Sequence, residues 1–137
     1  EIAAGALGPG VPERTMRVSP QHRMLVEGQE AQMHFGTDEV LVAAMHLTAL
    51  PGVRRTRAEE DVTYIHVLFD RHEIVLGDGA WTESFQPADQ SLMGMDHAAR
   101  DEIFAIFPEL AEAGMAAHAY PAARITAEVE EAAILFS

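Results

Sequence analysis

The 137-residue chain contains no cysteine and has few basic residues. Without cysteine, disulfide bonds, thiolate metal sites and a cysteine nucleophile are excluded within these residues. There are 9 basic residues against 22 acidic ones, which gives a formal net charge of −13. A nucleic-acid-binding protein needs a basic face. The local cluster Arg54, Arg55 and Arg57 is followed at once by acidic residues, so we expect no nucleic-acid partner.

Long apolar runs are also missing. No run reaches the roughly 18 residues that a transmembrane helix needs, so we expect no membrane partner. The opening residues 1–7 lack the length and basic flank of a signal peptide. Because the chain begins at Glu1 rather than Met, we expect it to be a fragment of a longer protein. The sequence leaves open whether the parent is cytoplasmic or secreted.

At 48% hydrophobic and 23% charged residues, the chain is typical of one globular domain with a real core. The first two-thirds show mostly strand patterns. The strongest signal is the regular alternation of residues 62–69, which are rich in β-branched and aromatic side chains. Shorter strands are predicted at 16–26 (with an interruption at Pro20), 31–35, 40–42, 72–76 and 80–85.

The last third is typical of helices. Asp96 is a candidate N-cap for a helix that carries apolar residues on one stripe as far as Leu110, and Pro108 should end or kink it. A weaker helical pattern covers 112–119, and apolar residues recur at helical spacing from Ile125 to Phe136. We therefore predict a mainly β fold with C-terminal helices, divided into a β domain at 1–86 and a helical extension at 87–137.

A serine and a histidine stand three residues apart in Val18-Ser19-Pro20-Gln21-His22. A bend at Pro20 would bring the hydroxyl of Ser19 and the imidazole of His22 toward one peptide bond. The hydroxyl would then hydrogen-bond the carbonyl oxygen, and the imidazole would protonate the departing nitrogen. The structural alternative is a turn serine that bonds its own backbone beside a partly buried histidine.

A second histidine segment runs from Tyr64 through His66 and His72 to Gly79. At the start of a return strand, His72 is placed to reach a substrate at the sheet edge. The alternative is a surface histidine at a hairpin corner. A three-histidine zinc site of His22, His66 and His72 is also conceivable, since neutral imidazoles bind zinc well. The turn at Asp70-Arg71 separates two of these histidines, so we expect no metal and no cofactor.

Together the two segments resemble blocks of the Hint domain of hedgehog proteins and inteins, specifically its bacterial branch. Residues 18–23 are similar to the Thr-x-x-His block of the family, with serine in the hydroxyl position. Residues 64–79 are similar to the later block in the spacing of the aromatic residue, the histidine and the glycine. Between them, residues 42–47 resemble the short segment that follows the first block.

The resemblance implies self-processing in which His22, Ser19 and His72 are the catalytic candidates and the flanking polypeptide is the substrate. The nucleophile of the family, a cysteine or serine at the start of the domain, is not in this chain. Glu83-Ser84 stand where splicing inteins carry a His-Asn pair. We therefore expect an N-terminal acyl shift and self-cleavage in the intact parent, no asparagine cyclisation, and an inactive isolated fragment.

The competing hypothesis is that the chain is a non-catalytic β-fold binding or interaction module of a larger bacterial protein. An exposed sheet edge would also permit a homodimer.

Overall fold

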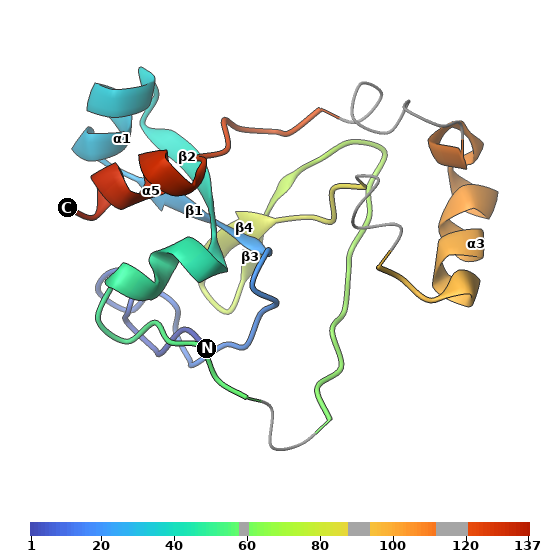
Figure 1. Cartoon of the computed structure of the whole chain (residues 1–137), viewed down its shortest axis with the longest axis horizontal. Coiled ribbons are helices and arrows are strands. Elements are labelled where there is room, and N and C mark those ends of the chain that lie inside the picture. Colours follow the sequence, from blue (N-terminus) through green and yellow to red (C-terminus); the bar gives the residue numbers. More distant parts are fainter. Residues whose placement is uncertain (58–60, 88–93, 112–120) are drawn as a thin grey trace.

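An antiparallel sheet of four strands, in the order β2-β1-β4-β3, organises this computed structural model (Figure 1). The structure describes residues 1–57, 61–87, 94–111 and 121–137. The helix predicted at 112–119 therefore lies outside the described residues. Within them, no helix is both long and apolar enough to cross a bilayer.

Two hairpin-like pairs form the sheet. β1 (Arg23–Glu27) pairs with β2 (Glu39–Ala43) along its whole length, and β3 (Ile74–Gly77) pairs with β4 (Ala80–Glu83). Asp78 and Gly79 connect β3 to β4 with φ values of 49° and 74°. Positive φ at both central residues is the geometry of the two-residue turn that Asp-Gly favours. The predicted strands at 40–42, 72–76 and 80–85 are confirmed to within a few residues.

The predicted return strand at 31–35 is wrong, because these residues belong to helix α1 (Gln29–Phe35). Good helix formers fill this segment, and only Ala31 is buried, so no alternating face is needed. Gly36 ends the helix in the left-handed conformation at φ 71°, where its N–H bonds the carbonyl oxygen of Gln32. Directly after β2, residues 44–49 form the 3-10 helix η1 (Ala44–Ala49).

The strongest strand pattern, at residues 62–69, forms no strand of this sheet. The segment runs as a long trace beside the sheet (Figure 1). A β-strand is defined by its hydrogen bonds to a neighbouring strand. Of residues 62–67, only Val67 bonds its backbone to the described chain. Its carbonyl oxygen accepts the N–H of Phe85 at 2.8 Å. The sequence pattern is thus present without the ladder that it predicts.

The C-terminal helix packs in the same core as the sheet. α5 (Val129–Leu135) begins with a capping box between Glu128 and Glu131 and buries Leu135. Just before it, the N–H of Leu41 bonds the carbonyl oxygen of residue 125 at 2.8 Å, and the N–H of residue 127 bonds the carbonyl oxygen of Leu41 at 2.9 Å. The main buried residues of this core are Ile2, Met24, Ala31, Val40, Val42, Leu47, Val53, Ala80, Ala127, Ala132 and Leu135.

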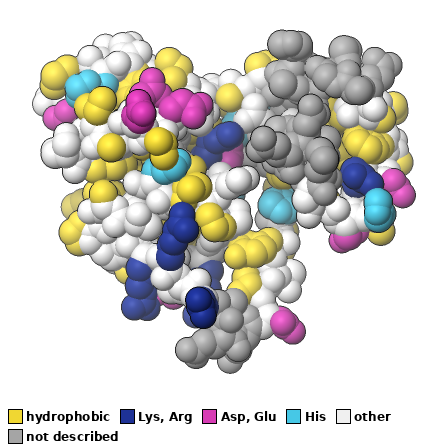
Figure 2. Space-filling view, in the orientation of Figure 1, with side chains coloured by type: hydrophobic (Ala, Val, Ile, Leu, Met, Phe, Trp, Pro, Cys, Tyr) yellow, Lys and Arg dark blue, Asp and Glu magenta, His cyan; other side chains and the backbone are white. Residues whose placement is uncertain are grey.

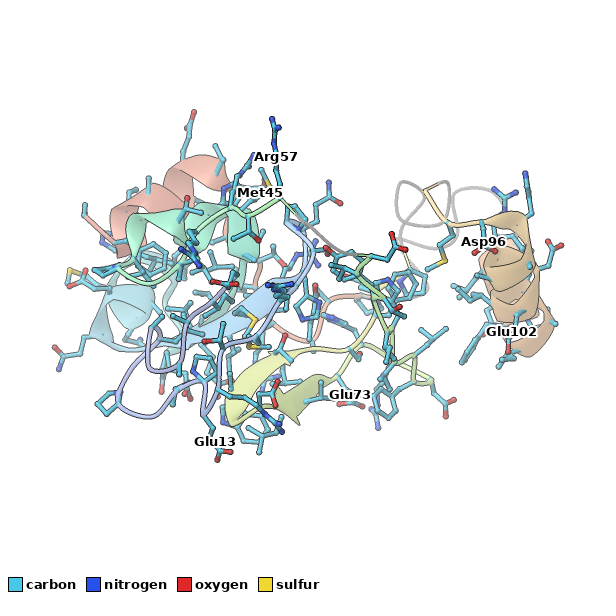
Figure 3. All side chains as sticks on the ribbon, turned by 90° about the horizontal axis from the view of Figure 1, so that it is seen from below. Glu13, Met45, Arg57, Glu73, Asp96 and Glu102 are labelled. Atoms are coloured by element: carbon cyan, nitrogen blue, oxygen red, sulfur yellow. The ribbon has the colours of Figure 1, made fainter. Side chains whose placement is uncertain are left out.

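A second, smaller apolar cluster joins α3 (His97–Ile106) and the 3-10 helix η2 (Pro108–Ala111) to Leu68, which packs against Leu110. The predicted cap is confirmed, since the N–H of Ala99 donates to the Asp96 carboxylate at 2.8 Å. α3 stands to one side of the sheet, with Asp96 at its first turn and Glu102 further along (Figures 1 and 3). A β-sheet followed by C-terminal helices confirms the predicted fold class, while the boundary at 86/87 stays a prediction.

Candidate functional site

A cavity of about 620 Å³ opens beside the sheet, where three segments far apart in the sequence come together. Its walls are the segment before β1 (residues 17–23), the extended segment 63–67, and the end of β4 with the residues after it (82–86). The volume lies within the range typical of ligand sites. The two sequence segments singled out above, around His22 and from Tyr64 onward, therefore meet at one site.

A tight turn carries Ser19 and His22 onto the cavity wall. The N–H of His22 bonds the carbonyl oxygen of Ser19 at 3.1 Å, with Pro20 at the second position of the turn, where its fixed φ is favoured. The turn is anchored to η1, because the N–H of Ala44 bonds the carbonyl oxygen of His22 at 2.8 Å and that of Met45 bonds Pro20 at 2.9 Å. The predicted bend at Pro20 is confirmed.

The ring of His22 is held by Thr82 on β4. The Thr82 hydroxyl donates to the carbonyl oxygen of Arg23 at 2.8 Å, and His22 Nε2 lies 2.5 Å from the same hydroxyl oxygen. A hydroxyl has one proton, which is already used, so Nε2 carries the hydrogen and donates it. Nδ1 of His22 then has a free lone pair, with no hydrogen bond to the described part of the chain. This is the tautomer that a general base needs.

Burial of His22 lowers the pKa of its imidazole below the usual 6.5, because a charged ring is poorly solvated there. The negative charge of Glu83 acts in the opposite direction and raises this pKa, while His66 and Arg23 lower it. The net direction is downward, so His22 is neutral at neutral pH. The carboxylate of Glu83 would stabilise the imidazolium that forms when His22 takes up a proton.

Glu83 lines the cavity and is the centre of a buried polar network. Its carboxylate accepts from the N–H of Arg23 at 2.9 Å, from the Arg23 guanidinium at 3.1 Å and from His72 Nε2 at 3.0 Å. Burial alone would raise the pKa of Glu83, but the hydrogen bond from His72 and the charge and N–H of Arg23 outweigh it and lower the pKa. Glu83 therefore stays charged at neutral pH.

His72 lies behind this wall and does not line the cavity. Its side chain is fully buried, and its Nδ1 accepts the N–H of Ala123 at 2.8 Å while Nε2 donates to Glu83. Both ring nitrogens are thus used. The structure places His72 next to the carboxylate that acts on His22, and it does not place His72 at the cavity surface with Ser19.

His66 also lines the cavity and packs on Phe85, with ring centroids 4.9 Å apart. Ser84 also lines the wall, but its hydroxyl accepts the N–H of Glu73, the residue just before β3, at 2.9 Å. Within the described ranges no three His, Cys, Asp or Glu side chains are grouped as they would be around a metal ion.

Sequence reasoning missed Thr82 and Glu83 as functional residues. Both reach His22 and Arg23 because β4 pairs with β1 at Met24↔Thr82, across almost sixty residues of chain. Nothing local in the sequence signals that pairing. The one available signal is that residues 80–85 were expected to be a strand, on which Thr82 and Ser84 share one face.

Comparison with known proteins identifies the family of this chain. Comparisons with curated proteins and with solved structures give no match. A family model described as Hint domain matches residues 1–89, which include β1 to β4 and every described wall of the cavity except residues 94 and 95. Since that match covers more than half of the 137 residues, the chain belongs to the Hint domain family.

Proposed function

We propose that these residues form the acid–base part of a self-processing Hint domain. In the parent protein the domain carries out an N-terminal acyl shift and cleaves one of its own peptide bonds, without asparagine cyclisation. The observation that carries the proposal is His22: it lies on a cavity wall, one ring nitrogen is fixed by Thr82, and the other is free to exchange a proton.

The proposed step begins with a cysteine thiol or serine hydroxyl supplied from outside these 137 residues. Its sulfur or oxygen attacks the carbonyl carbon of the preceding peptide bond, and its proton passes to Nδ1 of His22. The C–N bond then breaks, and His22 returns the proton to the departing nitrogen. The product is a thioester or ester, and water that attacks this bond releases the upstream polypeptide.

The neighbouring residues have supporting roles. Ser19, whose side chain lines the cavity beside His22, donates its hydroxyl to the carbonyl oxygen of the scissile bond. Glu83 stabilises the transient imidazolium of His22. His72 is a positioning residue that acts through Glu83, because it holds that carboxylate at 3.0 Å.

Absence of splicing follows from the chemistry of the two residues at the positions where inteins carry His-Asn. Glu83 and Ser84 have no side-chain amide to cyclise. Both are also tied into the sheet, Glu83 by Arg23 and His72, and Ser84 by Glu73. We therefore place the reaction at the upstream junction alone.

The test is to express the parent protein and map its fragments by intact-mass spectrometry. The parent should cut itself once, and His22→Ala should abolish the cut. His34→Ala is the matched control, because His34 is exposed on α1 and pairs there with Glu30. A cut that persists in His22→Ala would remove His22 from the mechanism.

The isolated 137-residue chain should release no new N-terminus when it is incubated with a thiol such as dithiothreitol. Release of a peptide from these residues alone would show that the nucleophile is among them, against the proposal.

A further inference from the structure

The extended segment 62–67 has the side chains of a buried strand and exposes them. Tyr64 is 50% exposed, Ile65 84% and Val67 52%. Where this segment runs, hydrophobic side chains lie at the surface close to a histidine (Figure 2). Apolar side chains on an extended chain without a neighbouring strand mark a place where another strand can be added.

The backbone of this segment faces the cavity at alternate residues. In an extended chain the N–H and C=O of one residue point to the same edge, and those of the next residue point to the other. The carbonyl oxygen of Val67 faces Phe85 on the cavity side. From the same alternation we infer that the backbone groups of Ile65 and Thr63, which also line the cavity, face it too; neither residue has a backbone hydrogen bond to the described chain.

We propose that an extended stretch of the flanking polypeptide adds as a strand inside this cavity and pairs with the backbone of Ile65 and Thr63. The docked strand continues the pairing that Val67 and Phe85 begin. It lies between residues 63–67 and the turn that carries Ser19 and His22, so its peptide bonds face His22. This inference rests on the proposed function, since it names how the substrate polypeptide is held.

The flanking polypeptide fits the cavity better than a second copy of the chain does. A net charge of −13 on each chain opposes self-association. A covalently attached segment, in contrast, has a high effective concentration and needs little intrinsic affinity. Pairing through backbone groups also places few demands on the sequence of the docked strand, which suits a domain that acts on whatever polypeptide precedes it.

The experiment uses the parent protein with His22→Ala, which keeps its substrate uncut, and the isolated 137-residue chain. Hydrogen exchange of the Ile65 amide is measured in both by mass spectrometry with electron-transfer fragmentation. We expect exchange to be slowed by about tenfold or more in the parent. Equal exchange in the two proteins would overturn the docking proposal.

Substitutions in the otherwise native parent test the backbone contact itself. Ile65→Pro removes the N–H that faces the cavity and should slow self-cleavage at least about tenfold, the effect of one lost hydrogen bond. Ile65→Ala keeps the N–H and should retain most of the activity. Tyr64→Pro removes an N–H on the opposite edge and should have a smaller effect than Ile65→Pro. Equal rates for Ile65→Pro and Ile65→Ala would contradict the proposal.

The two proposals fail in different ways. A parent that never cuts itself but protects the Ile65 amide would refute self-cleavage and support strand docking. A parent that cuts itself and leaves this amide unprotected would support self-cleavage and refute strand docking. Protection that appears in the isolated chain and grows with its concentration would identify a second copy as the occupant and overturn the choice of the flanking polypeptide.

Discussion

Thr82 fixes the tautomer of His22. The Thr82 hydroxyl gives its only proton to the carbonyl oxygen of Arg23 at 2.8 Å, so at 2.5 Å it can only accept from His22 Nε2. One side chain on β4 thereby ties the start of β1 to the ring that faces the cavity. The other ring nitrogen, Nδ1, has no hydrogen bond within the described residues, and in the proposed mechanism it takes up the proton.

Replacing Thr82 by valine should therefore affect both stability and chemistry. The substitution keeps the shape but leaves the Nε2–H of His22 and the carbonyl oxygen of Arg23 without a partner, at a cost of about 1–3 kcal/mol in the free energy of unfolding. Urea denaturation measures this change. In the parent, the proposed self-cleavage should slow as His22 loses its fixed tautomer.

Thr82→Ser is the matched control, since it keeps the hydroxyl. It should retain most of the free energy of unfolding and most of the rate of self-cleavage in the parent. If Thr82→Val cuts as fast as the native parent, the tautomer of His22 is not set by this bond.

Acidification should destabilise the folded chain, because the titrations of His22 and Glu83 both lower the free energy of unfolding as the pH falls. His22 has a folded pKa below 6.5, so below that pH the unfolded state binds more protons and the free energy of unfolding falls until the folded pKa is passed. Glu83 has a folded pKa below 4.5, so its contribution is present above 4.5 and is lost as the pH falls through the folded value. Urea midpoints measured between about pH 7.5 and 3 should fall first in the pH range where His22 titrates and again in the range where Glu83 titrates.

The contribution of His22 is isolated by His22→Gln. Between about pH 7 and 5 this variant should lose less stability than the native chain, because the group that titrates in that window is gone. Parallel curves for the two proteins would show that His22 titrates with its ordinary pKa.

Removal of the buried His72 should destabilise the chain strongly. His72→Ala takes a donor away from the charged Glu83 and leaves the N–H of Ala123 without its acceptor, which we expect to cost about 2–4 kcal/mol in the free energy of unfolding. Thermal and urea unfolding measure the loss. His97→Ala is the control, because His97 is an exposed histidine at the start of α3, where substitutions typically change stability by less than about 0.5 kcal/mol.

A structural role for His72 also predicts its effect in the parent. At a temperature where His72→Ala remains folded, the cut should be slowed but not abolished, since His72 acts on His22 only through Glu83. Complete loss of the cut in a folded His72→Ala parent would indicate a direct role in the chemistry.

The two adjacent residues Ile134 and Leu135 test whether α5 belongs to the main core. Leu135 is 8% exposed and Ile134 is 45% exposed. Leu135→Ala should cost about 2–4 kcal/mol in the free energy of unfolding, whereas Ile134→Ala should change it by less than about 1 kcal/mol. Similar small effects at both positions would show that α5 is a separate appendage.

Local patterns in the sequence predicted the local parts of the structure. The turn at Pro20, the cap at Asp96 and the strands near Asp78-Gly79 depend on residues within a few positions of one another, and all three are confirmed. His22 could be singled out for the same reason, because the turn that presents it is encoded by its own neighbours.

The parts that were missed depend on contacts between distant residues. Thr82 and Glu83 belong to the site only through the pairing of β1 with β4, which no local pattern encodes. At 31–35, helix propensity prevailed over an expected return strand because β2 already supplies the partner of β1. Residues 62–67 have the pattern of a strand, yet only Val67 among them bonds its backbone to the described chain, so no ladder forms there.

The bonds between Leu41 and residues 125 and 127 have a consequence for the order of events in the cell. They join the edge of the sheet to a part of the chain that the ribosome makes more than eighty residues later. Contacts of such long range form late, so the core that supports the cavity is completed only after α5 has emerged from the ribosome. A nascent chain that has reached β4 therefore already contains His22 and Thr82, but not yet the part of the core that α5 supplies.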